Sequence, residues 1–216
     1  MAARAANLLV NLLTTCHAPT QLDAVGRITD ALAKLDVEPE AVVNNAGFGL
    51  VGEAAKLDLA EQLAMIDLNV RVLTDLSLAF VGTLERHRGG ILNVASIAAF
   101  LPGPGMAIYY ASKAYVLSFS EALHRELKPR GVRVTVLCPG PVPTEFQARA
   151  GVRNERYPSI VTQTAEQVAQ AGYRGLQAGR RLVVPGIGIK LVTFLLRVTP
   201  RGVAAAGVEA QQRLRR

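Results

Sequence analysis

The chain has 216 residues and a mass of 23.0 kDa, enough for one domain with a sizeable core. Half of the residues are hydrophobic and 19% are charged, which excludes a disordered chain. The two cysteines, Cys16 and Cys138, exclude a disulfide scaffold, and with three scattered histidines we expect no metal site. No apolar stretch is long enough to predict a membrane-spanning helix.

The positive charge is concentrated at the C-terminal end. Residues 174–216 contain nine basic side chains and one acidic side chain, whereas the first 173 residues contain 15 basic and 16 acidic ones. A balanced body with a basic appendage argues against a nucleic-acid-binding fold.

The first predicted elements are a strand, a helix and a second strand. Residues 7–13 form a short apolar run that is typical of a strand. Pro19 then opens a helix in which apolar side chains recur at three- and four-residue spacing. Residues 41–44 follow as a second strand.

A long helical pattern comes next, over residues 58–87. Asp58 and Glu61 form a capping box at its start. Residues 91–95 are typical of a buried strand, and residues 107–127 are typical of another helix.

The last part of the predicted fold continues the alternation. Residues 132–137 form a strand, Thr164 and Gln167 cap a helix that ends near residue 178, and residues 182–184 form a short final strand. Strands that alternate with helices of this length predict an α/β fold, a Rossmann-like parallel sheet with helices on both faces.

Ligands of open parallel sheets bind beyond the carboxyl ends of the strands. Three predicted strands end there in small or polar residues, at Asn44–Gly47, at Ser96 and at Pro139–Gly140. Small residues allow a flat ligand to approach the backbone. We therefore expect the site at this edge of the sheet.

Tyr109 and Lys113 are four residues apart and share one helix face. A phenol has a reference pKa of about 10, and an ammonium about 5 Å away stabilises its phenolate by roughly 3 kcal/mol at an effective dielectric of about 20. This pair predicts a lowered tyrosine pKa and an acid/base group near neutral pH. Taken alone, each of these residues is also typical of an ordinary helix or turn.

Ser96 is placed to donate a hydrogen bond to a carbonyl oxygen held against Tyr109. Asn69, in the long helix, is placed to hold a water that connects Lys113 to solvent. Because these groups occur together and in this order, a shared site is favoured over a chance arrangement.

The combination resembles the short-chain dehydrogenase/reductase family, NAD(P)-dependent oxidoreductases with a Rossmann-type sheet. The resemblance covers roughly residues 20–186. It rests on Asn44-Asn45-Ala46-Gly47, Asn69, Ser96, Tyr109 with Lys113, and Pro139-Gly140-Pro141-Val142-x-Thr144. It implies hydride transfer between NAD or NADP and a secondary alcohol or carbonyl compound. The apolar and small residues of the expected substrate lid, 143–180, favour a hydrophobic substrate.

The resemblance also implies a role for each matched residue. Tyr109 exchanges a proton with the substrate oxygen, which Ser96 orients. Lys113 lowers the tyrosine pKa and binds the nicotinamide ribose, and Asn69 anchors the water of a proton relay. Tyr109 and Lys113 also contact the cofactor, together with Asn45, Ala46 and Gly47 on the adenosine side and Pro139, Gly140, Val142 and Thr144 at the nicotinamide.

The family's opening strand and Thr-Gly-x-x-x-Gly-x-Gly turn, which place a pyrophosphate on a helix N-terminus, have no counterpart before residues 41–44. We therefore expect an N-terminally truncated, incomplete Rossmann-like domain over 1–186 that lacks the family's first strands. One hypothesis is that residues 7–13 pair beside 41–44. Another is that residues 1–18 are not native family sequence. The rival function is a non-catalytic remnant that binds no dinucleotide and acts at most as an oligomerisation partner.

Residues 187–216 are predicted as a basic helical extension. Four apolar residues share one helical face: Leu191, Phe194, Leu195 and Val198. Two interpretations stay open, a helix packed over the substrate cleft or a subunit interface, and an interfacial helix that contacts anionic lipids. The resemblance implies a homo-oligomer built through helices 58–87 and 107–127. Asn7 and Asn11 interrupt the only run resembling a signal peptide, so we expect a cytoplasmic location.

Overall fold

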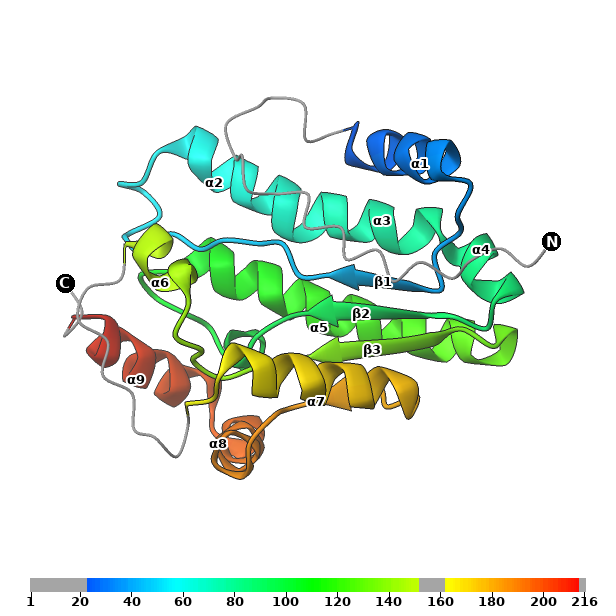
Figure 1. Ribbon diagram of the computed structural model, residues 1–216. Helices are drawn as coiled ribbons and strands as arrows, with labels where there is room; N and C mark the ends of the chain where they lie inside the picture. Colours follow the sequence, from blue (N-terminus) through cyan, green and yellow to red (C-terminus); the bar gives the residue numbers. More distant parts are fainter. Residues whose placement is uncertain (1–22, 152–161, 214–216) are drawn as a thin grey trace.

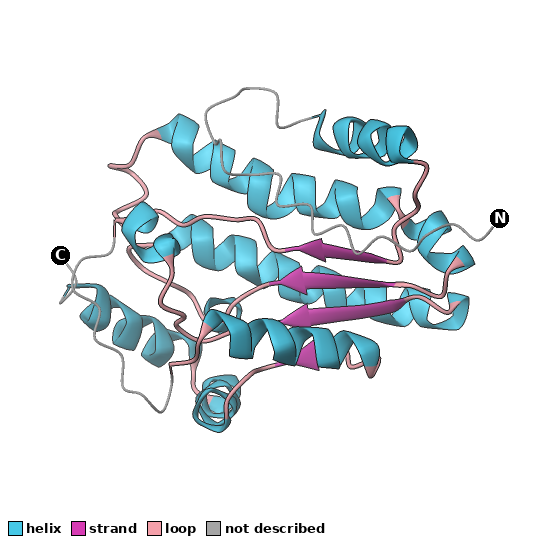
Figure 2. Ribbon diagram, viewed as in Figure 1, coloured by secondary structure: helices cyan, strands magenta, loops and turns pink. Residues whose placement is uncertain are grey.

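The computed structural model describes residues 23–151 and 162–213. Over these residues the core is a parallel sheet with the strand order β1-β2-β3-β4. The strands are β1 (Ala41–Asn44), β2 (Gly90–Val94), β3 (Arg133–Leu137) and β4 (Leu182–Val183). Helices cover both faces of the sheet (Figure 1 and Figure 2). The predicted α/β, Rossmann-like architecture is confirmed.

Alternate side chains of β2 define the two faces. Ile91 packs in one cluster with Leu123 of α5 (Ala107–Leu127). Leu92 packs in another cluster with Leu176 of α7 (Ala165–Gln177). Because successive strand residues point to opposite faces, each face receives its own helix layer.

Helix ends follow the predicted capping signals. The Asp58 carboxylate accepts a hydrogen bond from the backbone N–H of Glu61 (2.8 Å) at the start of α2 (Leu59–Ile66). Thr164 and Gln167 form a complete capping box at the start of α7. The bounds of α5 coincide with the prediction.

The long helical pattern over 58–87 is not one regular helix, which corrects the prediction. After α2, residues Asp67–Val72 are π-helical. The run continues as α3 (Leu73–Ala79), breaks at Phe80, and ends as α4 (Val81–Arg86). A π-helical stretch inserts an extra residue into a turn and is frequent at functional sites.

A buried chain of polar side chains joins the sheet to two of these helices. The Asn44 amide donates to Asn93 Oδ1 (2.8 Å) and to Ser77 Oγ (3.0 Å), and the Asn93 amide donates to Ser120 Oγ (2.9 Å). Buried polar groups of this kind are costly unless they are paired, so the network specifies one arrangement. It fixes the carboxyl ends of β1 and β2 relative to α3 and α5.

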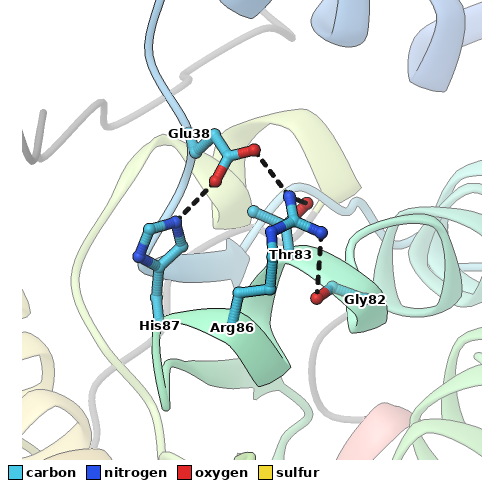
Figure 3. Close-up of polar contacts among 5 residues, drawn as sticks. All are labelled: Glu38, Gly82, Thr83, Arg86 and His87. Atoms are coloured by element: carbon cyan, nitrogen blue, oxygen red, sulfur yellow. Dashed lines mark hydrogen bonds and ion pairs between the residues drawn. The ribbon is translucent and has the colours of Figure 1, made fainter. Parts of the chain in front are cut away.

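The amino end of β1 is attached to α4 by an exposed cluster (Figure 3). Glu38 accepts a hydrogen bond from Arg86 Nη2 (2.5 Å), and its other oxygen lies 2.6 Å from His87 Nε2. His87 and Arg86 together lower the pKa of the Glu38 carboxyl. Exposed ion pairs contribute little to stability, so this cluster orients the chain more than it holds the fold.

The remaining helices complete the described chain. α1 (Ala24–Leu35) matches the helix predicted after Pro19 and buries Ile28 and Leu32. Short 3-10 helices follow Ser96 and α5, at Ile97–Phe100 and Lys128–Arg130. The others are α6 (Glu145–Ala150), α8 (Ile187–Val198) and α9 (Arg201–Arg213).

The predicted strand at 7–13 and its pairing beside β1 lie outside the described residues. Cys16 lies outside them as well. Within the described part, no helix has both the length and the apolar character needed to cross a bilayer, and no His, Cys, Asp or Glu cluster could hold a metal ion.

Candidate active site

The predicted site residues gather at the carboxyl edge of the sheet, toward which the strand arrows point in Figure 1. Ser96 follows β2, and its hydroxyl accepts a hydrogen bond from the backbone N–H of Ala98 (3.1 Å). That bond caps the short 3-10 helix and uses an acceptor site, so the hydroxyl proton is left to donate. The first turns of α5 carry Tyr109 and Lys113 to the same edge.

Tyr109 is buried among apolar and aromatic side chains. Its ring centroid lies 5.4 Å from that of Phe146 on α6 and 6.0 Å from that of Tyr110. Burial raises the pKa of Tyr109 to about 12, although a hydrogen bond from the Ser96 side chain acts in the opposite direction. The structure therefore brings Ser96 to the phenol, as predicted, and keeps the phenol protonated at neutral pH.

Lys113 is also buried and lies over the face of the same ring. Its Nζ is 5.9 Å from the Tyr109 ring centroid and donates a hydrogen bond to the backbone oxygen of Val94 (2.9 Å). Burial lowers the pKa of Lys113 to about 8, and the nearby Cys138 partly opposes that shift. This lysine thus ties α5 to the last residue of β2.

The predicted lowering of the tyrosine pKa by Lys113 is wrong for this structure. Burial of the Tyr109 phenol outweighs any stabilisation of its phenolate, and the pKa rises instead of falling. Helical spacing alone places the two side chains on one face, but it does not determine how far both are removed from water.

Asn69 sits fully buried inside the π-helical stretch and joins two parts of the site. Its side-chain amide donates to the Phe48 backbone oxygen (3.0 Å) and to Ser112 Oγ (3.1 Å), and its Oδ1 accepts from the Phe48 backbone N–H (3.2 Å). Ser112 Oγ in turn donates to the backbone oxygen of Tyr109 (2.7 Å). Asn69 therefore holds the segment after β1 against the first turn of α5.

Two glycines after β1 make room for these side chains. A methyl group at Gly47 would lie 2.8 Å from Asn69 Oδ1 and 3.4 Å from Lys113 Nζ. A methyl group at Gly49 would lie 3.0 Å from the Phe146 ring. Gly47 was predicted as a cofactor contact. In the structure, any side chain at this position would collide with Asn69, which explains the glycine.

The remaining predicted cofactor residues lie on the segments that follow β1 and β3. The backbone N–H of Ile97 donates to the Pro139 oxygen (3.0 Å), which joins the Ser96 turn to the segment after β3. Thr144 is exposed, and its backbone N–H donates to Gln147 Oε1 (3.1 Å) at the start of α6. Gly140 and Val142 are half-buried between these two points. Asn45 is exposed, and Ala46 is half-buried after β1.

These residues fit one end of a nicotinamide dinucleotide. The Lys113 ammonium carries three N–H donors. In the described part of the chain, it donates one hydrogen bond, to the Val94 oxygen. A ribose diol offers acceptors of the matching chemistry. The sequence contains no Thr-Gly-x-x-x-Gly-x-Gly turn, and the residues described above match the nicotinamide end.

Sequence reasoning missed three contributors to the site: Phe48, Ser112 and Phe146. Phe48 acts through its backbone, which no side-chain pattern reveals. Ser112 lies within the Tyr109–Lys113 spacing, so its position was a usable signal. Phe146 belongs to α6, and only tertiary packing brings its ring to Tyr109.

Comparisons with known proteins agree with this geometry. The family model described as short chain dehydrogenase matches residues 12–155. The sulfoacetaldehyde reductase of Chromohalobacter salexigens is 37% identical over 156 residues, which cover 68% of this chain and 62% of that protein. The serine 3-dehydrogenase of Agrobacterium fabrum is 31% identical over 156 residues, covering 69% and 61%. Across the first relatives, the chain spans between half and two thirds of their length.

Solved structures show the same fold. A short chain dehydrogenase from Burkholderia cenocepacia in complex with NADP superposes with a TM-score of 0.70 at 27% identity, covering 85% of this chain and 74% of that one. A short-chain dehydrogenase from Sphingobium yanoikuyae in complex with NADPH gives a TM-score of 0.65 at 28% identity, covering 76% and 64%. From the family match, these relatives and the shared sheet, the chain belongs to the short chain dehydrogenase family of oxidoreductases.

Proposed function

We propose that this site transfers a hydride between NAD or NADP and a secondary alcohol or carbonyl compound. The observation that carries the proposal is the buried, protonated Tyr109 phenol beside the Ser96 hydroxyl, with Lys113 across the ring. When bound, the cofactor supplies or accepts the hydride, whereas the protein supplies the proton and the orientation.

In the reductive direction, Tyr109 acts as the general acid toward the carbonyl oxygen. Ser96 donates a hydrogen bond to the same oxygen and so holds it against the phenol. The phenolate that remains after proton transfer is stabilised by the Lys113 cation, which a low-dielectric site makes more effective than water would. Oxidation of an alcohol uses the same groups in reverse.

Lys113 has a second role toward the ribose next to the nicotinamide, through the donors that do not bind Val94. Pro139, Gly140, Val142 and Thr144 flank that end of the cofactor in the proposal, and Asn45, Ala46 and Gly47 lie toward the adenosine. Asn69 remains the proposed anchor for a water that returns the proton from solvent.

The substrate proposed for this site is apolar. Tyr109 packs in a cluster with Phe48, Met65 and Met106, and Phe146 of α6 lies against its ring. An apolar lining favours a ketone or aldehyde with hydrocarbon substituents over a charged one. Residues 143–180 are the proposed lid, and α6 is the part of it that touches the catalytic ring.

A second copy of the chain is the proposed partner along α2. Leu59, Leu63 and Ile66 recur at four- and three-residue spacing on α2 and are all exposed. Tyr115 of α5 is exposed as well. An apolar stripe on neighbouring helices favours a helix-to-helix contact between copies.

Cofactor titration followed by turnover tests the proposed function. Fluorescence of NADH and NADPH is titrated with the chain, and reduction of a series of ketones is then measured. Tyr109→Phe is expected to lower turnover by about 10²–10⁴-fold while cofactor binding persists. Tyr115→Phe, which keeps the ring of an exposed tyrosine on α5 outside the proposed lid, is the matched control and should leave turnover unchanged.

The opposite result favours the rival interpretation. If neither cofactor binds saturably at millimolar concentration, the chain is a non-catalytic member of its family. If cofactor binds but Tyr109→Phe keeps its turnover, another residue supplies the proton.

A further inference from the structure

The outer face of α8 is apolar and exposed. Five side chains on it are between 52% and 87% exposed: Ile187, Leu191, Phe194, Leu195 and Val198. At 3.6 residues per turn these positions fall within an arc of about 100°. The opposite side of the helix buries Ile189 and Thr193, so α8 is fixed to the protein by one face and presents the other outward.

This face lies at the margin of the molecule. In Figure 1, α8 is seen nearly end-on below α7, on the side opposite α1. The Thr193 hydroxyl is directed to the backbone oxygens of Ile189 (3.0 Å) and Lys190 (2.9 Å), so this polar group is satisfied on the buried side of the helix. The exposed residues therefore form a continuous apolar ridge.

Basic residues surround the ridge in the sequence. Residues 187–216 contain six basic side chains and one acidic side chain, a net charge of +5. Lys190 on α8 and Arg201 at the start of α9 are exposed. The apolar stripe of α2 has a different setting, because Asp67 at its end pairs with Arg71 (2.8 Å), so that the two charges balance. The apolar faces of α2 and α8 thus differ in the charge of their surroundings.

We propose that α8, together with the exposed Lys190 and Arg201, binds the surface of an anionic phospholipid membrane. The ridge would enter the boundary between headgroups and acyl chains, while the basic side chains contact the headgroups. A lysine beside the ridge can lay its methylene stem along the apolar surface and keep its ammonium at the headgroups. α8 has 12 residues, about 18 Å, which is too short to span a hydrocarbon core of about 30 Å, so it lies in the plane of the membrane.

Charge decides between a membrane and a second copy as the occupant of this face. A symmetric contact through α8 would bring together two helices that each carry two basic residues and no acidic residue, which is unfavourable. An anionic surface compensates the same charge. A second copy is therefore assigned to α2, beside which Asp67 and Arg71 are paired, and the lipid surface to α8.

The placement of α8 connects this surface to the catalytic group. α8 packs against the 3-10 helix Ile97–Phe100, which directly follows Ser96. A membrane-bound α8 would hold the carboxyl edge of the sheet near the lipid. This consequence rests on the proposed function, whereas lipid binding itself does not.

Vesicle co-sedimentation of the full chain tests the proposal. The probes are vesicles of phosphatidylcholine alone and of phosphatidylcholine with phosphatidylserine, each at low and high salt. We expect binding to the anionic vesicles that weakens at high salt. The double variant L191S/F194S removes apolar contact, and K190E/R201E reverses charge; each should weaken binding by roughly tenfold or more. Leu35→Ser, at an exposed apolar position at the end of α1, is the matched control and should bind as the unmodified chain does.

All the substituted side chains are exposed, so each variant is expected to fold. Circular dichroism and thermal melting check this. Equal binding of L191S/F194S and the unmodified chain would overturn the proposal, as would the absence of binding to anionic vesicles at low salt. A dimer in light scattering that L191S/F194S dissociates and Leu63→Ser does not would also overturn it, in favour of a second copy on α8. The assay requires no turnover, so it fails or succeeds independently of the dehydrogenase activity.

Discussion

The Lys113 ammonium lies 5.9 Å from the centroid of the Tyr109 ring and is hydrogen-bonded to the backbone of Val94 at the end of β2. At this distance a cation is attracted by the face of an aromatic ring. The cation therefore acts on the ring of the proposed proton donor and also ties its helix to the sheet. Loss of either partner is expected to affect the site more than the global fold.

Burial of Lys113 predicts a specific dependence of stability on pH. Its pKa is about 8 in the folded chain and 10.5 ordinarily, so between these values the unfolded chain binds more protons. The free energy of unfolding should therefore rise with pH across this window, by on the order of 3 kcal/mol, while below pH 8 the burial penalty is fully present. Tyr109 has the opposite effect above about pH 10. Because its pKa is raised to about 12 in the folded chain, the free energy of unfolding should fall with pH there.

Urea unfolding between about pH 8 and pH 10 checks this expectation. Lys113→Met should abolish the rise, so the difference between variant and unmodified chain should change with pH. Lys128→Met, at an exposed lysine after α5, should preserve the rise. A pH-independent difference for Lys113→Met would mean that the buried ammonium does not titrate in this range.

Asn69 is predicted to contribute more to stability than any exposed asparagine. Asn69→Ala leaves the backbone N–H and C=O of Phe48 without their partner and should destabilise the fold by about 2–4 kcal/mol. Asn45→Ala removes the same side chain from an exposed position and should change stability by less than about 0.5 kcal/mol. Equal effects of the two substitutions in denaturant unfolding would contradict the bracing role of Asn69.

Alanine substitution at two glycines should have opposite signs. Gly47→Ala places a methyl group 2.8 Å from Asn69 Oδ1 and should destabilise the chain by roughly 1–3 kcal/mol. Gly82 lies inside α4 with no atom within 4 Å of an added methyl group, so Gly82→Ala should stabilise by about 0.5–1 kcal/mol. Thermal melting of both variants tests the pair. Stabilisation by Gly47→Ala would show that the Asn69 contact relaxes without cost.

Phe146 is predicted to limit the size of the substrate. Its ring lies against Tyr109, and α6 is anchored by a hydrogen bond from Val51 N–H to the Ala150 oxygen (3.0 Å). Under the proposed function, Phe146→Ala should raise kcat/KM for bulky ketones relative to small ones by roughly tenfold. Phe194→Ala, which removes a phenyl ring from α8, should leave that ratio unchanged in the absence of membranes. An unaltered ratio for Phe146→Ala would place the substrate elsewhere along the sheet edge.

Local patterns determined where α5 and α7 begin and end. α5 spans Ala107–Leu127 as predicted, and Thr164 with Gln167 caps α7. These features depend on side-chain periodicity and on hydrogen bonds within one turn, so neighbouring residues are sufficient to specify them. The order of Ser96, Tyr109 and Lys113 likewise pointed to the proposed catalytic group, because a fixed helical spacing carries two of its members.

Only the tertiary structure decided how those residues are surrounded. Burial reversed the expected direction of the Tyr109 pKa, and long-range packing brought Phe146 and the Phe48 backbone into the site. The outward direction of the apolar face of α8 was equally unspecified by its spacing, since the same pattern serves a buried helix. Periodicity tells which residues share a face, whereas contacts between distant segments determine whether that face meets the core, a second side chain or the outside of the molecule.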